Sequence, residues 1–554
     1  MGIYLNPENV DFQEVLNSKI YVDKSELIQY TNSVLRTTQK YICVSRPRRF
    51  GKSMAANMLT AYYSRGCDSG ELFQGLKIAT HPDFEKHLNR YNVIHLNMRD
   101  YLTESENMKQ LIQFVEDDLL DELQQEFSDL RMPRRKTLVK VLEQAFAQYK
   151  IPFVFIIDEW DCIFRVHKSD AASQKDYLDF LRNLLKDKSY IALAYMTGIL
   201  PIKKYGEHSA INVFYEYSMT DASPIEEFTG FTEQEVRQLC EQYNMPFSET
   251  KKWYDGYRFG NTDIYCPWDV INHCRALKVE PDATPQPYWI NTSGNYIVKR
   301  FIEKANQQTR REIEQLIEGK AIQKEITSLK DEIDRISTDT EYKEIRLELT
   351  YNELDSTIEN LWSVLFATGY LTQQGKPQGR TYSLIIPNES IRQIFIEQIQ
   401  EWFKETTRKD ENRLKDFCKA FEEGNAEAIE EQFNNYLMKT ISIRDTFTTK
   451  KENFYHGVLL GLLSYDPDWY ITSNQESGDG YSDIMIEAEQ ARIGIIIEVK
   501  YAENIKTLDK ACQKALKQIK EKNYDQKLEE EGYETILNYG IACYKKRCKV
   551  LVDK

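Results

Sequence analysis

The sequence predicts an α/β protein built from several domains, and three observations favour this fold class. The chain has 554 residues, which is more than one hydrophobic core accommodates, so roughly 3–4 domains are expected. Residues 1–230 alternate short apolar runs with helical patterns, which favours a parallel sheet flanked by helices. Residues 452–524 contain a second group of apolar runs that end in charged side chains.

Composition narrows the class of protein. The chain is 41% hydrophobic and 29% charged, as globular proteins are, and its formal net charge of −15 argues against a surface that coats nucleic acid everywhere. Its ten cysteines form no Cys-x-x-Cys pair, so we expect buried free thiols in a reducing compartment. No signal-peptide pattern opens the chain, and no apolar stretch approaches the ~18–20 residues that span a membrane, so a cytoplasmic location is expected.

The first element that carries chemistry is a strand, loop and helix between residues 41 and 63. The run Tyr41–Ser45 predicts a buried strand, and residues 54–63 read as a helix. Between them, Arg46-Pro-Arg-Arg-Phe-Gly-Lys-Ser53 ends as a phosphate-binding loop ends. Loop amides and the helix N-terminus would face an anion, Lys52 would reach the terminal phosphates, and Ser53 would offer a hydroxyl to Mg²⁺. A full motif has glycine in place of Arg46, and Gly-Lys-Ser alone also occurs in ordinary turns.

Two later strands bring polar side chains to the same edge of the predicted sheet. The apolar run 151–157 ends in Asp158 and Glu159, and the run 190–196 ends in Thr197. Because ligands of open α/β sheets bind at the carboxyl ends of strands, we expect these groups beside Lys52. Nucleotide hydrolases use such an acid for Mg²⁺ and the next glutamate for the attacking water, which assigns these roles to Asp158 and Glu159. Thr197 is a candidate sensor of the terminal phosphate, and a solvated strand end is the alternative for an isolated Asp-Glu pair.

The middle of the chain predicts mostly helices. Residues 231–306 read as a helical lid in which Trp253-Tyr-Asp-Gly-Tyr257 is interpreted as core packing. Between residues 307 and 358, apolar side chains at three-to-four spacing predict an amphipathic helix or part of a helical hairpin. These side chains are Ile313, Leu316, Ile317, Ile322, Ile326, Leu329, Ile333 and Ile336. Residues 361–403 read as helix, turn, β-wing and helix, a winged-helix-like module that is either a structural adaptor or a DNA-binding element. The expected domains are 1–230, 231–306, 307–405 and 406–554.

The C-terminal region predicts a second site on two strands of one hairpin. Asp483 follows a glycine-containing stretch, and the apolar run 493–497 ends in Glu498-Val-Lys500. Alternation along a strand places Glu498 and Lys500 on one face, and Asp483 can reach the same point from the neighbouring strand. Two carboxylates and the Val499 carbonyl suit Mg²⁺, and Lys500 can orient a water or help to deprotonate it. Glu-Val-Lys at a strand end is commonplace when it stands alone.

Together these motifs resemble bacterial AAA-ATPase-like proteins fused to a C-terminal PD-(D/E)XK nuclease domain. The resemblance extends over nearly the whole chain, and its motifs lie at residues 21–25, 46–53, 157–161, 196–198, 230–236 and 253–257. In that family arginine is usual at the position of Arg46. The resemblance implies a P-loop NTPase-like sheet that binds ATP, with Glu159 acting on water and the nucleotide held by Arg46, Arg49, Phe50, Gly51, Lys52, Ser53, Met54, Asp158 and Thr197. In the nuclease domain it implies a catalytic set of Asp483, Glu498, Lys500, Glu452 and Gln518.

A basic stripe follows the second site. Lysines recur at intervals of four, four and three on one face of a predicted helix, at positions 506, 510, 514 and 517. Residues 500–554 hold 13 Lys+Arg against 9 Asp+Glu, a local excess of positive charge in a chain whose net charge is −15. We therefore expect nucleic acid, DNA rather than RNA, as the partner of this domain. A solvated helix face is the alternative.

The combined prediction is an ATP-binding protein with a Mg²⁺-dependent nuclease domain whose DNA cleavage is gated by the nucleotide. Two alternatives stay open. The first is an ATP-gated switch that binds nucleic acid or a partner without cleavage. The second is an ATP-driven remodelling motor with the C-terminal domain as adaptor. Such motors usually need an arginine from a neighbouring subunit, and Lys203 and Lys204 are the candidates for that charge after Thr197.

Overall fold

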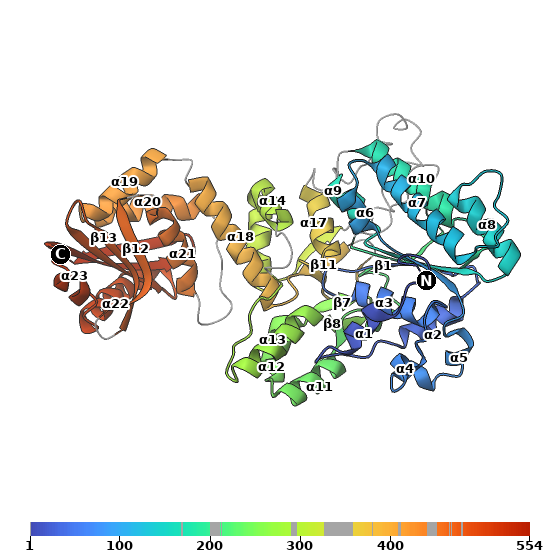
Figure 1. The fold of residues 1–554 in the computed structure, drawn as a ribbon. Coiled ribbons are helices and arrows are strands. Elements are labelled where there is room, and N and C mark those ends of the chain that lie inside the picture. Colours follow the sequence, from blue (N-terminus) through green and yellow to red (C-terminus); the bar gives the residue numbers. More distant parts are fainter. Residues whose placement is uncertain are drawn as a thin grey trace. The chain divides into compact units, whose positions relative to one another are not determined.

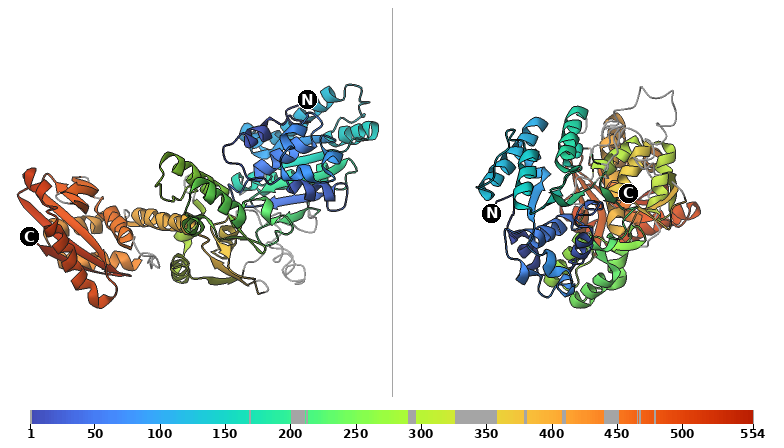
Figure 2. Two further views of the ribbon diagram at one scale, coloured as in Figure 1. Left: turned by 90° about the horizontal axis from the view of Figure 1, so that it is seen from below. Right: turned by 90° about the vertical axis from the view of Figure 1, so that its right-hand side faces the viewer.

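The chain forms two compact units in the computed structural model (Figures 1 and 2). The first comprises Met1–Ser293 and Gln323–Ile391, and the second comprises Gly294–Ile322 and Arg392–Lys554. The expected division into four domains stays a prediction. The structure describes residues 2–167, 170–199, 211, 213–289, 296–325, 358–378, 381–407, 411–439, 451–464, 466, 468–477 and 480–553.

A parallel five-stranded sheet in the order β2-β3-β4-β1-β5 forms the centre of the first unit. Its strands are β1 (Tyr41–Ser45), β2 (Asn92–Asn97), β3 (Phe153–Asp158), β4 (Ile191–Gly198) and β5 (Tyr215–Tyr217). Every residue of β1, β3 and β4 is buried, as expected for strands covered on both faces. The α/β fold class predicted from the apolar runs is therefore confirmed for this unit.

Helices cover both faces of this sheet. Figure 1 shows α7, α8 and α10 on one face and α1, α2 and α3 on the other. The helices of this part are α1 (Val10–Leu16), α2 (Leu27–Val34), α3 (Lys52–Tyr63), α4 (Gly70–Phe73), η1 (Lys77–Thr80), α5 (Phe84–His87), α6 (Met98–Glu104), α7 (Met108–Glu126), α8 (Leu138–Tyr149), α9 (Cys162–Val166) and α10 (Ala171–Leu185). The sheet and α3 share one apolar core, which includes Ile42, Val44, Leu59, Val154 and Tyr195.

A lid of three helices and a small antiparallel sheet follows. Its elements are η2 (Glu226–Phe228), β6 (Phe231–Thr232), α11 (Glu233–Tyr243), α12 (Phe247–Tyr254), β7 (Tyr257–Phe259), β8 (Thr262–Tyr265) and α13 (Pro267–Val279). The sheet order is β6-β8-β7, and strands this short give little periodic signal, so only the helices were predictable. Tyr254 and Tyr257 are fully buried, in agreement with the interpretation of their motif as core.

The expected helix, β-wing and helix are present after the lid. They are α17 (Ile358–Ala367), β10 (Thr372–Gln373), β11 (Thr381–Ile385) and α18 (Glu389–Thr407), and β9 (Ile322–Glu325) completes a sheet in the order β10-β11-β9. The expectation that Ile322 continues an amphipathic helix is wrong. The helix α15 (Gln307–Ile317) ends two residues before Gly319, whose φ of 76° is left-handed, and the chain then enters β9. Four predicted members, Ile326, Leu329, Ile333 and Ile336, lie outside the described residues.

The second unit contains a mixed five-stranded sheet in the order β12-β13-β14-β15-β16. β12, β13 and β14 are antiparallel, β14 and β15 are parallel, and β16 returns antiparallel. Figure 1 shows α19, α20 and α21 on one side of the sheet and α22 on the other. The elements are α14 (Tyr296–Lys304), α15, α18, α19 (Glu411–Glu422), α20 (Ala426–Lys439), α21 (Lys451–Leu463), β12 (Trp469–Ser477), β13 (Gly480–Ala488), β14 (Ile493–Tyr501), η5 (Ile505–Thr507), α22 (Leu508–Glu521), α23 (Gln526–Glu530), β15 (Thr535–Tyr544) and β16 (Arg547–Asp553).

Two further expectations concern cysteines and membranes. All ten cysteines are free, and all but Cys67 are buried, which confirms the expected free thiols. In the described parts of the chain, no helix has the length and apolar character needed to cross a bilayer.

Candidate functional sites

The loop between β1 and α3 places Lys52 at the carboxyl edge of the parallel sheet. Gly51 has a φ of 84°, which a residue without Cβ adopts at no steric cost, and α3 begins at the next residue. Lys52 is only 6% exposed, and its Nζ donates to the carbonyls of Arg46 (3.1 Å) and Pro47 (2.8 Å). Burial lowers the pKa of Lys52 to about 8, although Glu159 and Asp158 attract its charged form. The ammonium is thus held by loop carbonyls that an anion can replace.

Arg46 is fully buried and positions this loop. Its guanidinium donates to the carbonyls of Ser45 (3.0 Å) and Tyr217 (2.6 Å) and to Thr229 Oγ1 (3.1 Å). It also lies 4.6 Å from the ring centroid of Phe259 in the lid. The residue at the position of the missing glycine therefore ties β1, β5 and the lid together. Its predicted part in nucleotide binding stays a prediction.

The carboxylates of β3 lie at the same sheet edge. Asp158 is 5% exposed, and its Oδ1 accepts from Thr197 Oγ1 and from the Glu159 amide (3.0 Å). Thr197 is fully buried, and its hydroxyl donates its hydrogen bond to Asp158. The adjacent Gly198 is required here, because a Cβ would lie 2.6 Å from Trp160 Nε1. The structure brings Lys52, Asp158 and Glu159 together as predicted.

Glu159 is paired with an arginine that the sequence motifs did not reveal. Arg165 of α9 forms an ion pair with Glu159 Oε2, and its Nε lies 3.4 Å from Asp161 Oδ2. Burial would raise the pKa of Glu159, but Arg165 and Lys52 outweigh burial and lower it. Arg165 belongs to no motif, and only its position seven residues after Asp158 could have drawn attention to it.

An apolar pocket adjoins the phosphate loop. The N-terminal segment, the first turns of α3 and the lid line it, and Phe50, Gly51 and Met54 are among its lining residues. Their predicted contacts with a nucleotide stay a prediction. The other lining residues are Phe12, Val15, Ile20, Tyr21, Val22, Lys24, Ala55, Met58, Phe228, Gly230, Phe231, Pro267 and Ile271. Arg49 instead lies over the Trp268 ring in α13, 4.2 Å from its centroid, and Ser53 is exposed at the start of α3.

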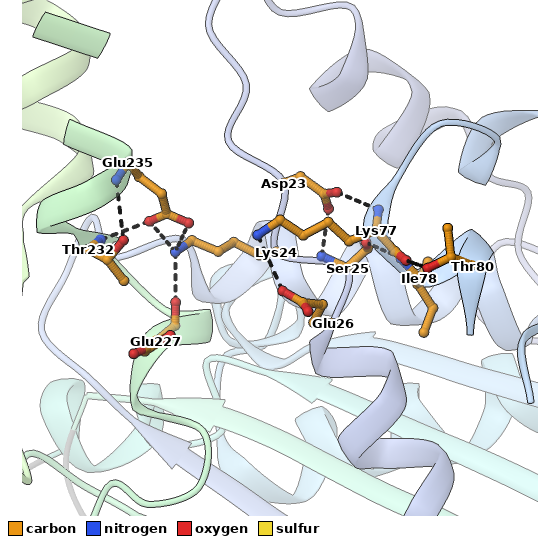
Figure 3. Close-up of polar contacts among 10 residues, drawn as sticks. All are labelled: Asp23, Lys24, Ser25, Glu26, Lys77, Ile78, Thr80, Glu227, Thr232 and Glu235. Atoms are coloured by element: carbon orange, nitrogen blue, oxygen red, sulfur yellow. Dashed lines mark hydrogen bonds and ion pairs between the residues drawn. The ribbon is translucent and has the colours of Figure 1, made fainter. Parts of the chain in front are cut away.

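The segment 21–26 forms one wall of the pocket and is fixed on two sides (Figure 3). Lys24 Nζ donates to both carboxylate oxygens of Glu235 (2.7 and 2.6 Å) and to the Glu227 carbonyl (2.7 Å) in the lid. On the other side, Asp23 accepts from the Ser25 and Lys77 amides (2.8 and 2.7 Å). Lys24 therefore connects the two walls of the pocket.

The hairpin of the second unit brings the predicted nuclease residues together. Ile484 pairs with Ile497 in the β13–β14 ladder, so Asp483 and Glu498 meet at the end of the paired segment. Asp483 Oδ2 accepts from the Val499 amide (2.8 Å), and Lys500 Nζ donates to Glu498 Oε1 (2.7 Å). Burial raises the pKa of Glu498 to about 7 and Asp483 adds to this, while Lys500 opposes it. Burial would lower the pKa of Lys500, but the hydrogen bond and the charge of Glu498 outweigh burial and raise it.

Glu452 and Gln518 reach this site from the helices. Gln518 Nε2 of α22 donates to Glu498 Oε1 (2.5 Å). Glu452 of α21 accepts from the Tyr501 amide (3.2 Å) and lies 3.9 Å from Lys500 Nζ. A further residue, His456, shares a hydrogen bond with Ser473 Oγ (3.0 Å). All five predicted catalytic residues of this domain are therefore neighbours.

The donor set fits a hard divalent cation. Glu498 is 2% exposed, and its Oε2 has no hydrogen-bond partner among the residues that the structure describes. A buried oxygen left in this way carries a desolvation cost that a ligand would remove. In the described ranges, no group of three or more His, Cys, Asp or Glu side chains could hold a metal. Two carboxylates and a carbonyl suit Mg²⁺, which keeps several of its waters in protein sites.

Comparison with protein families gives separate matches for the two parts of the chain that contain the two candidate sites. Residues 10–206 match a family model described as "Predicted AAA-ATPase", and residues 450–552 match the model of the PD-(D/E)XK nuclease superfamily. The chain thus has an AAA-ATPase-like domain near its N-terminus and a PD-(D/E)XK nuclease-like domain near its C-terminus. The resemblance predicted from the motifs is confirmed.

Individual proteins that resemble this chain share little sequence identity with it. An "Uncharacterized protein in vnfD 5'region" from Azotobacter chroococcum mcd 1 is 24% identical over 260 residues, which cover 45% of this chain and 46% of that protein. The chain thus spans about half the length of this relative. Among solved structures, the Aeropyrum pernix ORC2 protein in ADPNP–ADP complexes aligns with a TM-score of 0.29 and 11% identity over 70% of this chain and 96% of that one. A DNA replication initiation factor aligns with a TM-score of 0.23 and 10% identity over 63% and 97%. Likeness at this level carries no functional argument.

Proposed function

We propose that this chain binds ATP in its first unit and cleaves nucleic-acid phosphodiester bonds in its second, with Mg²⁺ at both sites. The observation that carries the nuclease half is the convergence of Asp483, Glu498 and Lys500 from two strands, completed by Gln518 from α22. The family matches at both ends of the chain support the same assignment.

The nucleotide half is supported by the loop and the pocket beside it. Lys52 and the N-terminus of α3 offer positive charge to phosphates, and the apolar pocket offers a place for the adenine base. Asp158 and Ser53 would hold Mg²⁺ at the phosphates, and Glu159 would polarise the water that attacks the terminal phosphorus. These roles make hydrolysis of ATP the proposed reaction of this unit.

The nuclease half assigns each residue one task. Asp483, Glu498 and the Val499 carbonyl would hold Mg²⁺, which supplies Lewis-acid activation of water and charge neutralisation at the phosphate when bound. Lys500 would orient the attacking water and stabilise negative charge on the phosphate, because its ammonium is protonated beside Glu498. Glu452 and Gln518 would fix the positions of Lys500 and Glu498.

DNA is the proposed substrate of this domain. The four lysines of the predicted stripe, at positions 506, 510, 514 and 517, are all exposed, three of them on α22 and the first in η5 just before it. Exposed lysines of this kind contact phosphate backbones without reading sequence. We further propose that the nucleotide state of the first unit gates cleavage by the second.

A cleavage panel tests the nuclease half. Purified protein is incubated with duplex, single-stranded and branched DNA and with RNA, in Mg²⁺ or in EDTA. We expect Mg²⁺-dependent cleavage that Asp483→Ala and Lys500→Ala abolish, while Asp416→Ala and Lys415→Ala on the exposed face of α19 retain it. Cleavage that persists in Asp483→Ala would place the site elsewhere. Binding of DNA without cleavage by the unaltered protein would favour a switch that only recognises nucleic acid.

A further inference from the structure

Arg165 is a positively charged side chain that lies among carboxylates of the first unit. It lies on α9, four residues beyond the turn that follows β3, and its side chain is 20% exposed. Its guanidinium contacts both Glu159 and Asp161, and the Asp161 side chain has no exposure to solvent. The arginine is therefore held at the carboxyl edge of the sheet, where the phosphates of a nucleotide would lie.

Other cations gather at the same edge. Burial lowers the pKa of Arg48 in the phosphate loop, and repulsion from Arg165 and Arg99 adds to this, while Glu159 opposes it. Arg48 therefore lies near enough to Arg165 and Glu159 for both charges to shift its pKa. Lys52 belongs to the same group of cations, and its positive charge also lowers the pKa of Glu159.

Cationic and acidic side chains lie close together at this edge of the sheet. The cationic side chains of Lys52, Arg48 and Arg165 lie near the carboxylates of Asp158, Glu159 and Asp161, and the exposed Arg99 and Asp100 flank this group. A polyphosphate would add several negative charges to this group and compete with Glu159 for Arg165. Competition of this kind would also free the Glu159 carboxylate to accept a proton from water.

We infer that Arg165 is a catalytic residue supplied in cis, which exchanges Glu159 for the terminal phosphate of bound ATP. This inference rests on the proposed function of the same site. In the reaction, the water oxygen forms a bond to the terminal phosphorus while the bond to the bridging oxygen breaks. ADP leaves with that electron pair, Glu159 takes the water proton, and Arg165 neutralises charge on the transferred group. One chain then supplies the arginine that ring-forming ATPases take from a neighbour.

The test separates binding from turnover. Affinities for ATP and ADP and single-turnover hydrolysis rates are measured for the unaltered protein, Arg165→Ala, Arg165→Lys and the surface control Arg182→Ala, whose arginine pairs with Asp179 on α10. We expect Arg165→Ala to lower the hydrolysis rate at least ~100-fold, as loss of one transition-state donor does, with ADP affinity within about 3-fold of the unaltered protein. Arg182→Ala should behave as the unaltered protein, and Arg165→Lys should restore only part of the rate.

Three results would overturn the inference. An unchanged or faster rate in Arg165→Ala would mean that Arg165 merely restrains Glu159. A rate per chain that rises with protein concentration, or that mixing Arg165→Ala with Glu159→Gln restores, would assign the arginine to a second copy. If the protein binds ATP without hydrolysing it, Arg165→Ala must still reduce the ratio of the affinities for ATP and ADP about 10-fold. An unchanged ratio would refute the inference. Failure of the unaltered protein to bind ATP would instead refute the proposed function itself.

Discussion

Asp269 is a buried carboxyl group that makes stability depend on pH. It lies in the first turn of α13 with no exposure to solvent. Burial raises its pKa to about 7, although Cys266, the Trp289 backbone and Ser390 favour its ionised form. Because the folded state binds the proton more tightly than the unfolded state, folding takes up a proton between about pH 4 and pH 7, and stability falls as pH rises through this window.

The expected loss of unfolding free energy at pH 8 is on the order of 4 kcal/mol, since a pKa that differs by one between the folded and unfolded states corresponds to about 1.4 kcal/mol. Denaturant unfolding of the protein from pH 5 to pH 8 should therefore show a falling free energy whose slope Asp269→Asn reduces, while the contribution of Glu498 remains. The exposed Asp282→Asn serves as the control and should retain the slope. Parallel slopes in all three proteins would show that Asp269 does not titrate in this range.

Some residues of the sites could be predicted from the sequence and others could not, for a physical reason. Asp158 ends β3, Glu159 follows it directly, and Lys52 follows β1 after the loop 46–51, so their positions after parallel strands place them at one edge. Asp483, Glu498 and Lys500 could also be predicted from the sequence. Side chains alternate between the two faces of a strand, and these three residues lie on neighbouring strands of one hairpin. Arg165 lies on a short helix that carries no recognised motif, and its contacts with Glu159 and Asp161 depend on the course of the chain between β3 and α9. The structural use of Arg46 depends on Tyr217 and Thr229, which are more than 170 residues away in the chain.

At the scale of elements, the ion pair between Lys24 and Glu235 closes the lid on the apolar pocket. The two side chains are only 16% and 15% exposed, and the pair links segment 21–26 to α11. A second, exposed pair, Lys77 and Glu26, is drawn in Figure 3 for comparison. Its nitrogen and oxygen are 3.2 Å apart, and its side chains are 54% and 50% exposed. Exposed pairs contribute about 0–1 kcal/mol, whereas charge-assisted hydrogen bonds away from solvent contribute more.

We therefore expect Lys24→Ala to weaken ATP binding about 10-fold, equivalent to about 1.4 kcal/mol, and Lys77→Ala to leave it within about 2-fold. Glu235→Ala should weaken binding similarly, and the double variant should be no worse than either single one, because both remove the same interaction. Isothermal titration with ATP measures the unaltered protein and the four variants. Additive losses, or an equal effect of Lys77→Ala, would refute the role of this pair in closing the lid.

Strands of the large sheet were the elements best predicted from the sequence. Continuous apolar runs bounded by polar residues predicted β1 with its observed bounds and β3 and β4 to within two residues. The lid strands β6, β7 and β8 have two to four residues each and became strands through pairing that only the folded chain provides. The same holds for β9, where Ile322 continues the spacing of a helix but follows the left-handed Gly319.

At the scale of the whole molecule, each unit has its own core and its own candidate site. The core of the parallel sheet includes Leu59 and Val154, and the nuclease-like domain has separate clusters around Ile496 and Cys512. The site residues named above for each unit all belong to that unit. Any effect of ATP on the affinity for DNA is therefore a coupling free energy between two sites, and such coupling is reciprocal.

This reciprocity gives the gating proposal a quantitative form. If ATP changes the affinity for DNA by a factor, saturating DNA must change the affinity for ATP by the same factor, typically about 5–150-fold in coupled proteins. We expect both titrations, made with Asp483→Ala so that DNA stays intact, to agree within error, and Lys52→Ala to abolish the effect of ATP on cleavage in the protein with Asp483 restored. Cleavage at equal rates with ATP, ADP and no nucleotide, unaltered by Lys52→Ala, would show that the two sites work independently. In that case the fusion of the two units in one chain would need an explanation other than energetic coupling, such as simultaneous delivery to one substrate, because independent sites on one chain still share a local concentration.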